Sequence, residues 1–101
     1  MPRTFAPIHP GEVLLHEFME PLGLSQNELA DTVDVPPRRI NQIVHGQRGM
    51  TADTALRLWK AFGLSDMFWI NMQSRYDAEM ARICLKDHLR KIHRIPTDRI
   101  A

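Results

Sequence analysis

Residues 26–45, QNELADTVDVPPRRINQIVH, predict two short helices joined by a tight turn. Ala30 is a small residue at the point where two such helices cross most closely, and Asp34 stands at a turn position that ordinarily carries glycine. A short polar residue tolerates the positive φ required there better than most others do. The apolar residues of this stretch fall on the inner sides of both helices: Leu29, Val33, Val35, Ile40 and Ile43. This spacing predicts a helix-turn-helix.

The outer face of the second of these helices carries side chains that can read DNA bases. Helical spacing turns this set outward: Pro37, Arg38, Asn41, Gln42 and His45, with Arg39 on the flank. Arg pairs with guanine, and Asn or Gln with adenine, in the major groove. Arg48, just after the helix, and the helix start at Gln26 are better placed to contact phosphates. We therefore expect sequence-specific binding to double-stranded DNA, the alternative being a face that is merely solvated.

Charge is segregated along the chain, although its formal sum is only +1. Residues 11–34 contain six acidic residues and no Lys or Arg, whereas residues 36–60 contain five basic residues against Asp53 alone. A local basic excess favours contact with a phosphate backbone. The basic excess thus includes the second helix of the motif, and both features indicate that this part of the chain contacts DNA.

Residues typical of helix ends predict five helices and no confident strand. The expected starts are Pro10, Ser25 with Glu28 as a capping box, Pro37, Thr51 and Ser65, and the expected ends are Pro21 with Gly23, Asp34, Gly46 and Gly63. The fifth helix is expected to continue to about His93, with a break near Ser74 as an alternative. Residues 3–8 are the one stretch that could pair with a partner's strand edge.

The apolar residues of these helices predict which sides are buried. The expected inward sets are Val13, Leu14, Phe18 and Leu22 in the first helix and Ala55, Leu56, Leu58, Trp59 and Phe62 in the fourth. The neighbouring aromatics Trp59, Phe62, Phe68 and Trp69 are interpreted as core, with a stacking site for single-stranded nucleic acid as the alternative.

A further apolar stripe, Tyr76, Met80, Ile83 and Cys84, extends beyond the point where a five-helix domain is already filled. We expect this stripe to form a homodimer, because a two-fold dimer places two recognition helices about one DNA turn apart on a palindrome. The alternative is that the stripe folds back on the first helix of its own chain.

The composition argues against several other classes of protein. No run of about 18 apolar residues exists, and the first five residues lack a secretion-signal layout, so a cytoplasmic location is expected. Cys84, the only cysteine, cannot form an internal disulfide and is expected to be a small core or interface residue. The five histidines show neither HxxxH nor HExxH spacing, so no metal site is expected. Scattered Ser, His and Asp, without a nucleophile elbow or glycine-rich loop, predict neither catalysis nor a cofactor.

Four stretches of the chain resemble the HigA-type antitoxins, a branch of the Xre-like helix-turn-helix repressors. These are IHPGEVLLHEFMEPLGLSQNELA from residue 8, INQIVHGQR from residue 40, MTADTALRLWKAFG from residue 50 and FWINMQSRYD from residue 68. The leading His9-Pro10-Gly11 and the Phe68-Trp69 pair narrow the likeness to this branch, whereas Asp34 and the Pro36-Pro37 pair depart from its pattern.

The resemblance implies an all-α, five-helix lambda-repressor-like domain with an extended C-terminal helix. The resemblance covers residues 8 to about 80, and the residues themselves divide the chain into a lead at 1–9, a DNA-binding domain at 10–75, a dimerisation helix at 76–93 and a flexible tail at 94–101. The resemblance also implies a neighbouring HigB-type toxin, usually a ribosome-dependent messenger RNA endonuclease, that the protein neutralises while repressing the shared operon. The lead and the basic tail are the candidates for toxin contact. Two alternatives stay open: a regulator without a toxin, and a protein-interaction module whose helix-turn-helix no longer meets DNA.

Overall fold

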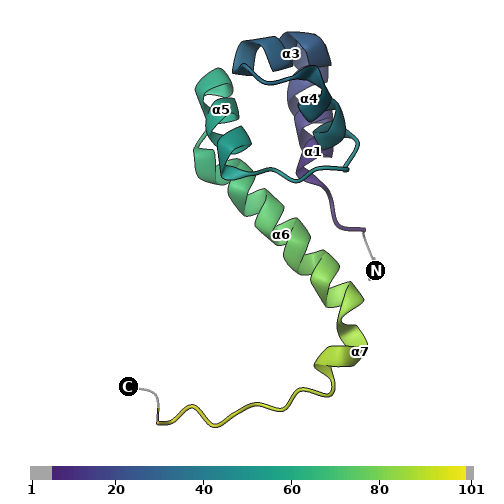
Figure 1. Ribbon diagram of the computed structural model, residues 1–101, viewed down its shortest axis with the longest axis vertical. Helices are drawn as coiled ribbons and strands as arrows, with labels where there is room; N and C mark the ends of the chain where they lie inside the picture. Colours follow the sequence, from purple (N-terminus) through teal and green to yellow (C-terminus); the bar gives the residue numbers. More distant parts are fainter. Residues whose placement is uncertain (1–5, 100–101) are drawn as a thin grey trace.

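The computed structural model describes residues 6–99, and within that range it contains helices and no strand. The chain forms α1 (Pro10–Val13), the π-helix η1 (Leu14–Met19), α2 (Glu20–Leu22), α3 (Gln26–Val33), α4 (Pro37–Val44), α5 (Ala52–Phe62), α6 (Asp66–Cys84) and α7 (Lys86–Leu89). The first three elements follow one another without a break and correspond to the first predicted helix. Figure 1 shows α1, α3, α4 and α5 gathered into one bundle, with α6 leading away from it towards α7.

The first helix contains a π turn that the sequence pattern did not predict. The backbone N–H of Glu20 donates to the carbonyl of Leu15, five residues earlier, as in a π-helix. Leu14 and Met19, five residues apart, are both buried, whereas the expected inward residue Leu22 is 61% exposed. Pro21 lies inside α2 instead of ending the helix, and Gly23, in a left-handed conformation, ends it. The predicted inward residues Val13, Leu14 and Phe18 are confirmed as buried or packed against the core. The prediction was wrong for Leu22, and it omitted Met19.

A single core holds the bundle together. Its fully or nearly fully buried apolar residues come from every part of the bundle: Leu14, Met19, Leu29, Ala30, Val33, Val35, Ile40, Ile43, Val44, Met50, Ala55, Leu58 and Trp69. The predicted inward residues of the helix-turn-helix all belong to this set. In α5, by contrast, Leu56 and Trp59 are 46% and 43% exposed, so their prediction as core residues was wrong. Phe68 is 37% exposed, whereas Trp69 is fully buried and its ring packs against the rings of Phe18 and Phe68.

The start of the first helix packs closely against the end of α4 at three residues, His9, Pro10 and Gly11. The Nδ1 atom of His9 accepts a hydrogen bond of 2.9 Å from the backbone N–H of Gly11 and so caps α1. A Cβ atom on Gly11 would lie 1.8 Å from the carbonyl oxygen of Ile43, so only glycine permits this approach of the two backbones. Burial lowers the pKa of His9, with Glu12 and Asp77 acting in the opposite direction.

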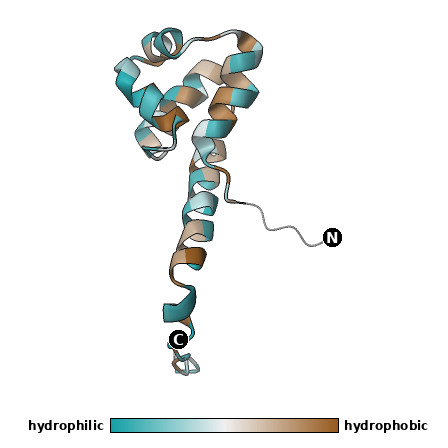
Figure 2. Cartoon of the chain, turned by 90° about the vertical axis from the view of Figure 1, so that its right-hand side faces the viewer, coloured by the Kyte–Doolittle hydropathy of each residue, from teal (hydrophilic) through white to brown (hydrophobic). Residues whose placement is uncertain are grey.

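The second half of α6 leaves the bundle. Every described residue from 81 onward is exposed, and the radius of gyration of 17.5 Å exceeds the roughly 13 Å typical of a compact chain of this length. The helix ends at Cys84 and a second short helix, α7, follows Leu85, so neither the predicted end at about His93 nor a break near Ser74 occurs. Cys84 is exposed and is therefore not a core residue. Figure 2 shows apolar and polar residues alternating along this projecting segment.

The ends of the chain add little regular structure. Residues 94–99 form no helix and are exposed. The expectation of a strand pairing at residues 3–8 falls partly on residues outside the described range, and residues 6–8 form no strand. No helix of the described range is long and apolar enough to cross a membrane.

Candidate DNA-binding surface

The first helix of the motif, α3, begins at a complete capping box. The Oγ atom of Ser25 accepts from the backbone N–H of Glu28 at 3.0 Å, and the backbone N–H of Ser25 donates to Oε1 of Glu28 at 3.0 Å. Hydrogen bonding from Ser25, first of all from its backbone N–H, favours the ionised carboxylate and lowers the pKa of Glu28. The predicted start of α3 is thus confirmed, and Gln26 is its first residue.

The turn between α3 and α4 adopts the conformation that the motif requires. Asp34 has φ 59° and ψ 53°, in the left-handed region where the motif ordinarily places glycine. The backbone N–H of Val35 then donates to the carbonyl of Ala30 at 3.0 Å, closing the end of α3. Ala30 and Ile40 are completely buried at the crossing of the two helices. Asp34 therefore takes the place of glycine, and the turn keeps its shape.

The outer face of α4 carries the residues predicted to meet DNA. Pro37, Arg38, Asn41, His45 and Arg48 are exposed, and Gln26, Arg39 and Gln42 are half-buried. Nδ2 of Asn41 donates to Oε1 of Gln26 at 3.0 Å, which joins the start of α3 to the middle of α4. Nε of Arg48 donates to Oε1 of Gln42 at 3.1 Å. The predicted residues are thus brought together on one surface, and neighbouring amides orient one another on it.

Arg38 and Arg39 differ in their surroundings although they are adjacent. Arg38 is exposed and makes no side-chain hydrogen bond or ion pair to the described residues. Nη1 of Arg39 donates to Oδ1 of Asp53 at 2.8 Å, across to the first turn of α5. Arg38 is therefore free to meet a ligand, whereas one edge of the Arg39 guanidinium is already engaged.

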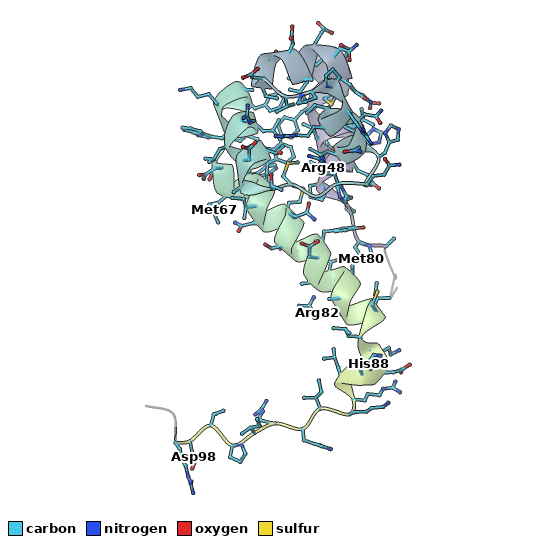
Figure 3. All side chains as sticks on the ribbon, in the orientation of Figure 1. Arg48, Met67, Met80, Arg82, His88 and Asp98 are labelled. Atoms are coloured by element: carbon cyan, nitrogen blue, oxygen red, sulfur yellow. The ribbon has the colours of Figure 1, made fainter. Side chains whose placement is uncertain are left out.

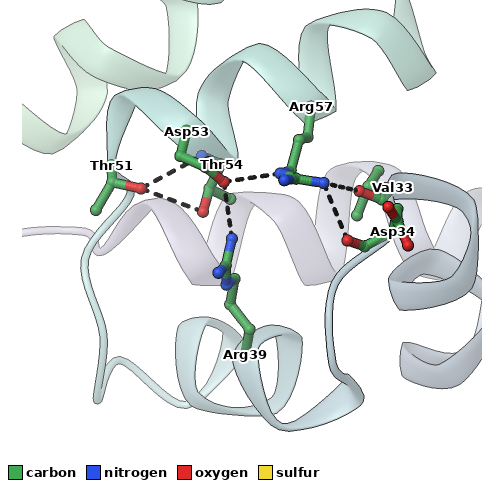
Figure 4. Close-up of polar contacts among 7 residues, drawn as sticks. All are labelled: Val33, Asp34, Arg39, Thr51, Asp53, Thr54 and Arg57. Carbon is green, nitrogen blue, oxygen red and sulfur yellow. Dashed lines mark hydrogen bonds and ion pairs between the residues drawn. The ribbon is translucent and has the colours of Figure 1, made fainter.

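Asp53 and Arg57 extend this contact to the turn of the motif (Figure 4). Oδ1 of Asp53 also accepts from Nε of Arg57 at 2.7 Å. Nη1 of Arg57 donates to the carbonyls of Val33 and Asp34, at 2.8 and 3.0 Å. The two guanidinium groups hold the pKa of Asp53 below its ordinary value, Arg57 contributing more than Arg39. We call Arg39, Asp53 and Arg57 the α5 clamp.

Sequence reasoning did not identify the α5 clamp as part of the surface. It counted Arg57 only towards the basic excess and treated Asp53 as its single exception. The spacing of four residues between Asp53 and Arg57 is a helical ion-pair signal that was available. Their contacts with Arg39, Val33 and Asp34 join segments 14 to 24 residues apart, and no local pattern reveals such pairings.

The predicted dimerisation stripe lies mostly on the projecting part of α6. Met80 and Ile83 are 36% and 62% exposed, and Cys84 is exposed as well. Tyr76 is half-buried and packs edge-on against His9, with ring centroids 4.9 Å apart. The alternative in which the stripe folds back on the first helix therefore fails beyond Tyr76. Figure 3 shows Met80 on the part of α6 that has left the bundle.

Comparisons with known proteins agree with this architecture. The family model described as helix-turn-helix matches residues 15–69. Virulence-associated protein I of Dichelobacter nodosus is 55% identical over 74 residues, which cover 73% of this chain and 68% of that protein. The solved structure of Pseudomonas aeruginosa antitoxin HigA with the higBA promoter superposes with a TM-score of 0.86 and 37% identity, covering 89% of this chain and 99% of that one.

A second solved structure extends the likeness along α6. An addiction module antidote protein of the HigA family from Coxiella burnetii superposes with a TM-score of 0.84 and 40% identity, covering 90% of this chain and 100% of that one. A match of that extent reaches beyond the bundle, so the projecting helix is part of the shared fold. The chain belongs to the Xre-like helix-turn-helix family, in the branch that contains the HigA-type antitoxins.

Proposed function

We propose that this protein is a repressor that binds a palindromic operator as a homodimer and is also the antitoxin of a toxin-antitoxin pair. The observation that carries the proposal is the outer face of α4. There, residue types able to read bases stand on a helix whose inner face is buried. The similar Pseudomonas aeruginosa HigA, solved with its higBA promoter, supports the DNA-binding part.

The surface divides into base-reading and phosphate-binding residues. Arg38, Asn41 and Gln42 read base edges in the major groove, with Pro37 and His45 at the two ends of the same face. Arg39, Arg48 and the start of α3 at Gln26 contact phosphates, which fix the position of the protein without reading sequence. Arg39 can do so while bound to Asp53, because a guanidinium has five N–H donors.

The projecting part of α6 provides the dimer contact in this proposal. Its apolar residues Met80 and Ile83 are exposed and lie outside the core, and large exposed apolar side chains mark association surfaces when they gather along one element. A two-fold pairing through Tyr76, Met80, Ile83 and Cys84 presents both α4 helices to successive major grooves. The half-sites of the operator are then about one helical turn apart.

The toxin partner is inferred from the family alone. We propose a HigB-type protein encoded beside this one, with the lead and the basic tail as its contacts. The second candidate is a transcriptional regulator without a toxin, and the presence or absence of a toxin gene next to this one separates the two. A third hypothesis is a protein-interaction module that no longer binds DNA. A binding titration against two DNA duplexes distinguishes it from the two regulators.

The test is a binding titration against the upstream region of the gene and against random duplex, at two salt concentrations. We expect a large preference for the upstream region and one dimer per palindrome. Arg38→Ala removes a base contact and should cost about 1 to 3 kcal/mol at one base-pair position, whereas Arg48→Ala should weaken binding to all sequences alike and reduce the salt slope by about one.

Arg94→Ala is the matched control, because Arg94 is exposed, follows α7 and lies outside both the outer face of α4 and the proposed dimer contact. It removes the same charge and should leave the sequence preference unchanged. Equal relaxation of preference by Arg38→Ala and Arg48→Ala would refute the division of roles. Equal weak binding of the unchanged protein to both duplexes, with the same result in an Arg38→Ala and Gln42→Ala double variant, would favour the interaction module.

A further inference from the structure

Asp53 occupies a position that is hard to explain by direct contact with DNA. It is in the first turn of α5, its side chain is 58% exposed, and it is the only carboxylate among residues 36–60. A carboxylate on a surface that meets phosphates repels them and weakens binding. Any favourable effect of Asp53 on DNA binding therefore has to come from the side chains that it binds, Arg39 and Arg57.

The α5 clamp connects three helices through one carboxylate oxygen. Oδ1 of Asp53 accepts from Arg39 of α4 and from Arg57 of α5, and Arg57 in turn reaches the last carbonyls of α3 (Figure 4). Those carbonyls are the ones that a helix end leaves without an intrahelical partner. The clamp thus fixes the turn of the motif and the first turn of α4 relative to the same point on α5.

Thermodynamic stability is a weak explanation for this arrangement. The side chains of Arg39, Asp53 and Arg57 are 26%, 58% and 35% exposed, and ion pairs at that exposure contribute little to folding. The core beneath α4 is complete without them, since Ile40 and Ile43 are fully buried against the bundle. What the clamp adds is a constraint on the outer side of α4, where the core does not reach.

Such a constraint matters for reading bases more than for binding phosphates. A bidentate contact between a side chain and a base edge needs accurate placement of both hydrogen bonds, whereas attraction to phosphates falls off gradually with distance. A small rotation of α4 would move Arg38, which no described residue holds in place, away from its base. It would leave the positive charge of the surface unchanged.

We propose that Asp53 is a positioning residue that determines the sequence specificity of this protein without touching DNA. It holds Arg39 and Arg57 so that α4 keeps a single orientation against the major groove. The proposal rests on the proposed function as a DNA-binding protein. It predicts that removing the carboxylate has opposite effects on the two kinds of binding, specific and non-specific.

The test is Asp53→Asn in the full-length chain, titrated against the operator and against random duplex. Asn keeps the size of Asp but loses the charge that holds two guanidinium groups. We expect affinity for the operator to fall and affinity for random duplex to rise about twofold, so that the specificity ratio drops roughly tenfold, within the range of known positional couplings. Thermal unfolding of the variant shows that both titrations are done on folded protein.

Asp31→Asn is the matched control, because Asp31 is an exposed aspartate of α3 that makes no ion pair with the described residues. It removes the same charge from the same domain, so any general electrostatic gain appears equally for both duplexes. If Asp53→Asn behaves like Asp31→Asn, with both affinities raised together, Asp53 has only an electrostatic effect and the proposal is wrong. A fall of both affinities by the same factor would equally overturn it, because the specificity ratio would then be unchanged.

Arg57→Lys provides a second, independent variant. Lys keeps the charge but cannot donate in the planar fork that joins Asp53 to the carbonyls of Val33 and Asp34. We expect the specificity ratio to fall while the salt slope stays as in the unchanged protein. An unaltered ratio would contradict the proposal. Failure of the unchanged protein to prefer its operator would instead contradict the proposed function, so the two failures are distinguishable.

Discussion

The bundle and the projecting segment of α6 place similar side chains in opposite surroundings. Ile43 in α4 is fully buried, whereas Ile83 in α6 is 62% exposed. The bundle closes its core with residues from Leu14 to Trp69. The segment after residue 80 has apolar residues and no core of its own. The folding stability contributed by buried apolar residues is therefore located in the bundle, whereas the segment after residue 80 leaves its apolar side chains exposed.

Gly11→Ala is expected to have the largest effect, because it acts where the bundle is packed most closely. The added Cβ would lie 1.8 Å from the carbonyl oxygen of Ile43, so the first helix and α4 must separate. Overpacking against a backbone that cannot yield costs about 3 kcal/mol or more. Urea unfolding followed by circular dichroism measures this loss as a lower midpoint.

Gly23→Ala is the control for this substitution. Gly23 has φ 65°, and nothing lies within 4 Å of the point that a Cβ atom would occupy, so alanine there meets backbone strain without a clash. We expect a loss of about 1 kcal/mol. Equal losses at the two positions would mean that the approach of α1 to α4 is not the tightest constraint in the bundle.

His9 is expected to give an intermediate effect that depends on pH. His9→Ala removes the cap of α1 and the contact with Tyr76, which together should cost about 2 kcal/mol at pH 7.5. Because burial lowers the pKa of His9, the folded protein resists a proton that the unfolded chain accepts below its ordinary pKa of 6.5. The stabilisation is therefore complete above that pH and is lost as the pH falls through the lower pKa of the folded state. Unfolding midpoints between pH 7.5 and pH 5 measure this decline.

Two variants separate the contribution of His9 from that of other groups. His9→Asn keeps a capping side chain that does not titrate, so it should flatten the pH dependence while preserving much of the stability. His16 is exposed and its pKa is raised by a hydrogen bond to Glu20, so it stabilises the fold at low pH and loses that effect as the pH rises; His16→Asn removes this opposing contribution. A pH profile that is unchanged in His9→Asn would show that the decline comes from another group.

The prediction from sequence succeeded where the signals were local to the bundle. Ser25 with Glu28, Thr51 and Gly63 mark helix ends through contacts with residues at most four positions away. Asp34 was identified as the substitute for glycine because its conformation is a property of one residue. These signals sufficed for the fold class, the helix-turn-helix and the outer face of α4.

The prediction failed where the deciding contacts lie outside the local pattern. The π turn shifts burial to Met19, which a regular period of 3.6 residues cannot reveal. Trp59 is apolar and at helical spacing, yet it lies on the surface beside Lys60, with the ammonium 5.7 Å from its ring centroid. The α5 clamp joins residues far apart in sequence. Apolar character and helical spacing therefore did not distinguish buried residues from exposed residues at the edge of the core.

Substitution of Ile83 is expected to have the smallest effect on the stability of the bundle and so gives the sharpest contrast with Ile43. Ile43→Ala leaves a cavity in the core and should cost about 3 kcal/mol, whereas Ile83→Ala should change the stability of a dissociated protomer by less than about 0.5 kcal/mol. If α6 pairs with a second copy, the unfolding midpoint of the unchanged protein rises with protein concentration, and Ile83→Ala weakens that dependence. Unfolding curves at several concentrations, with sedimentation as a check on mass, measure both quantities. A midpoint that is independent of concentration, together with the mass of a single chain, would remove the projecting segment of α6 as a dimer contact and leave its apolar side chains to a different partner.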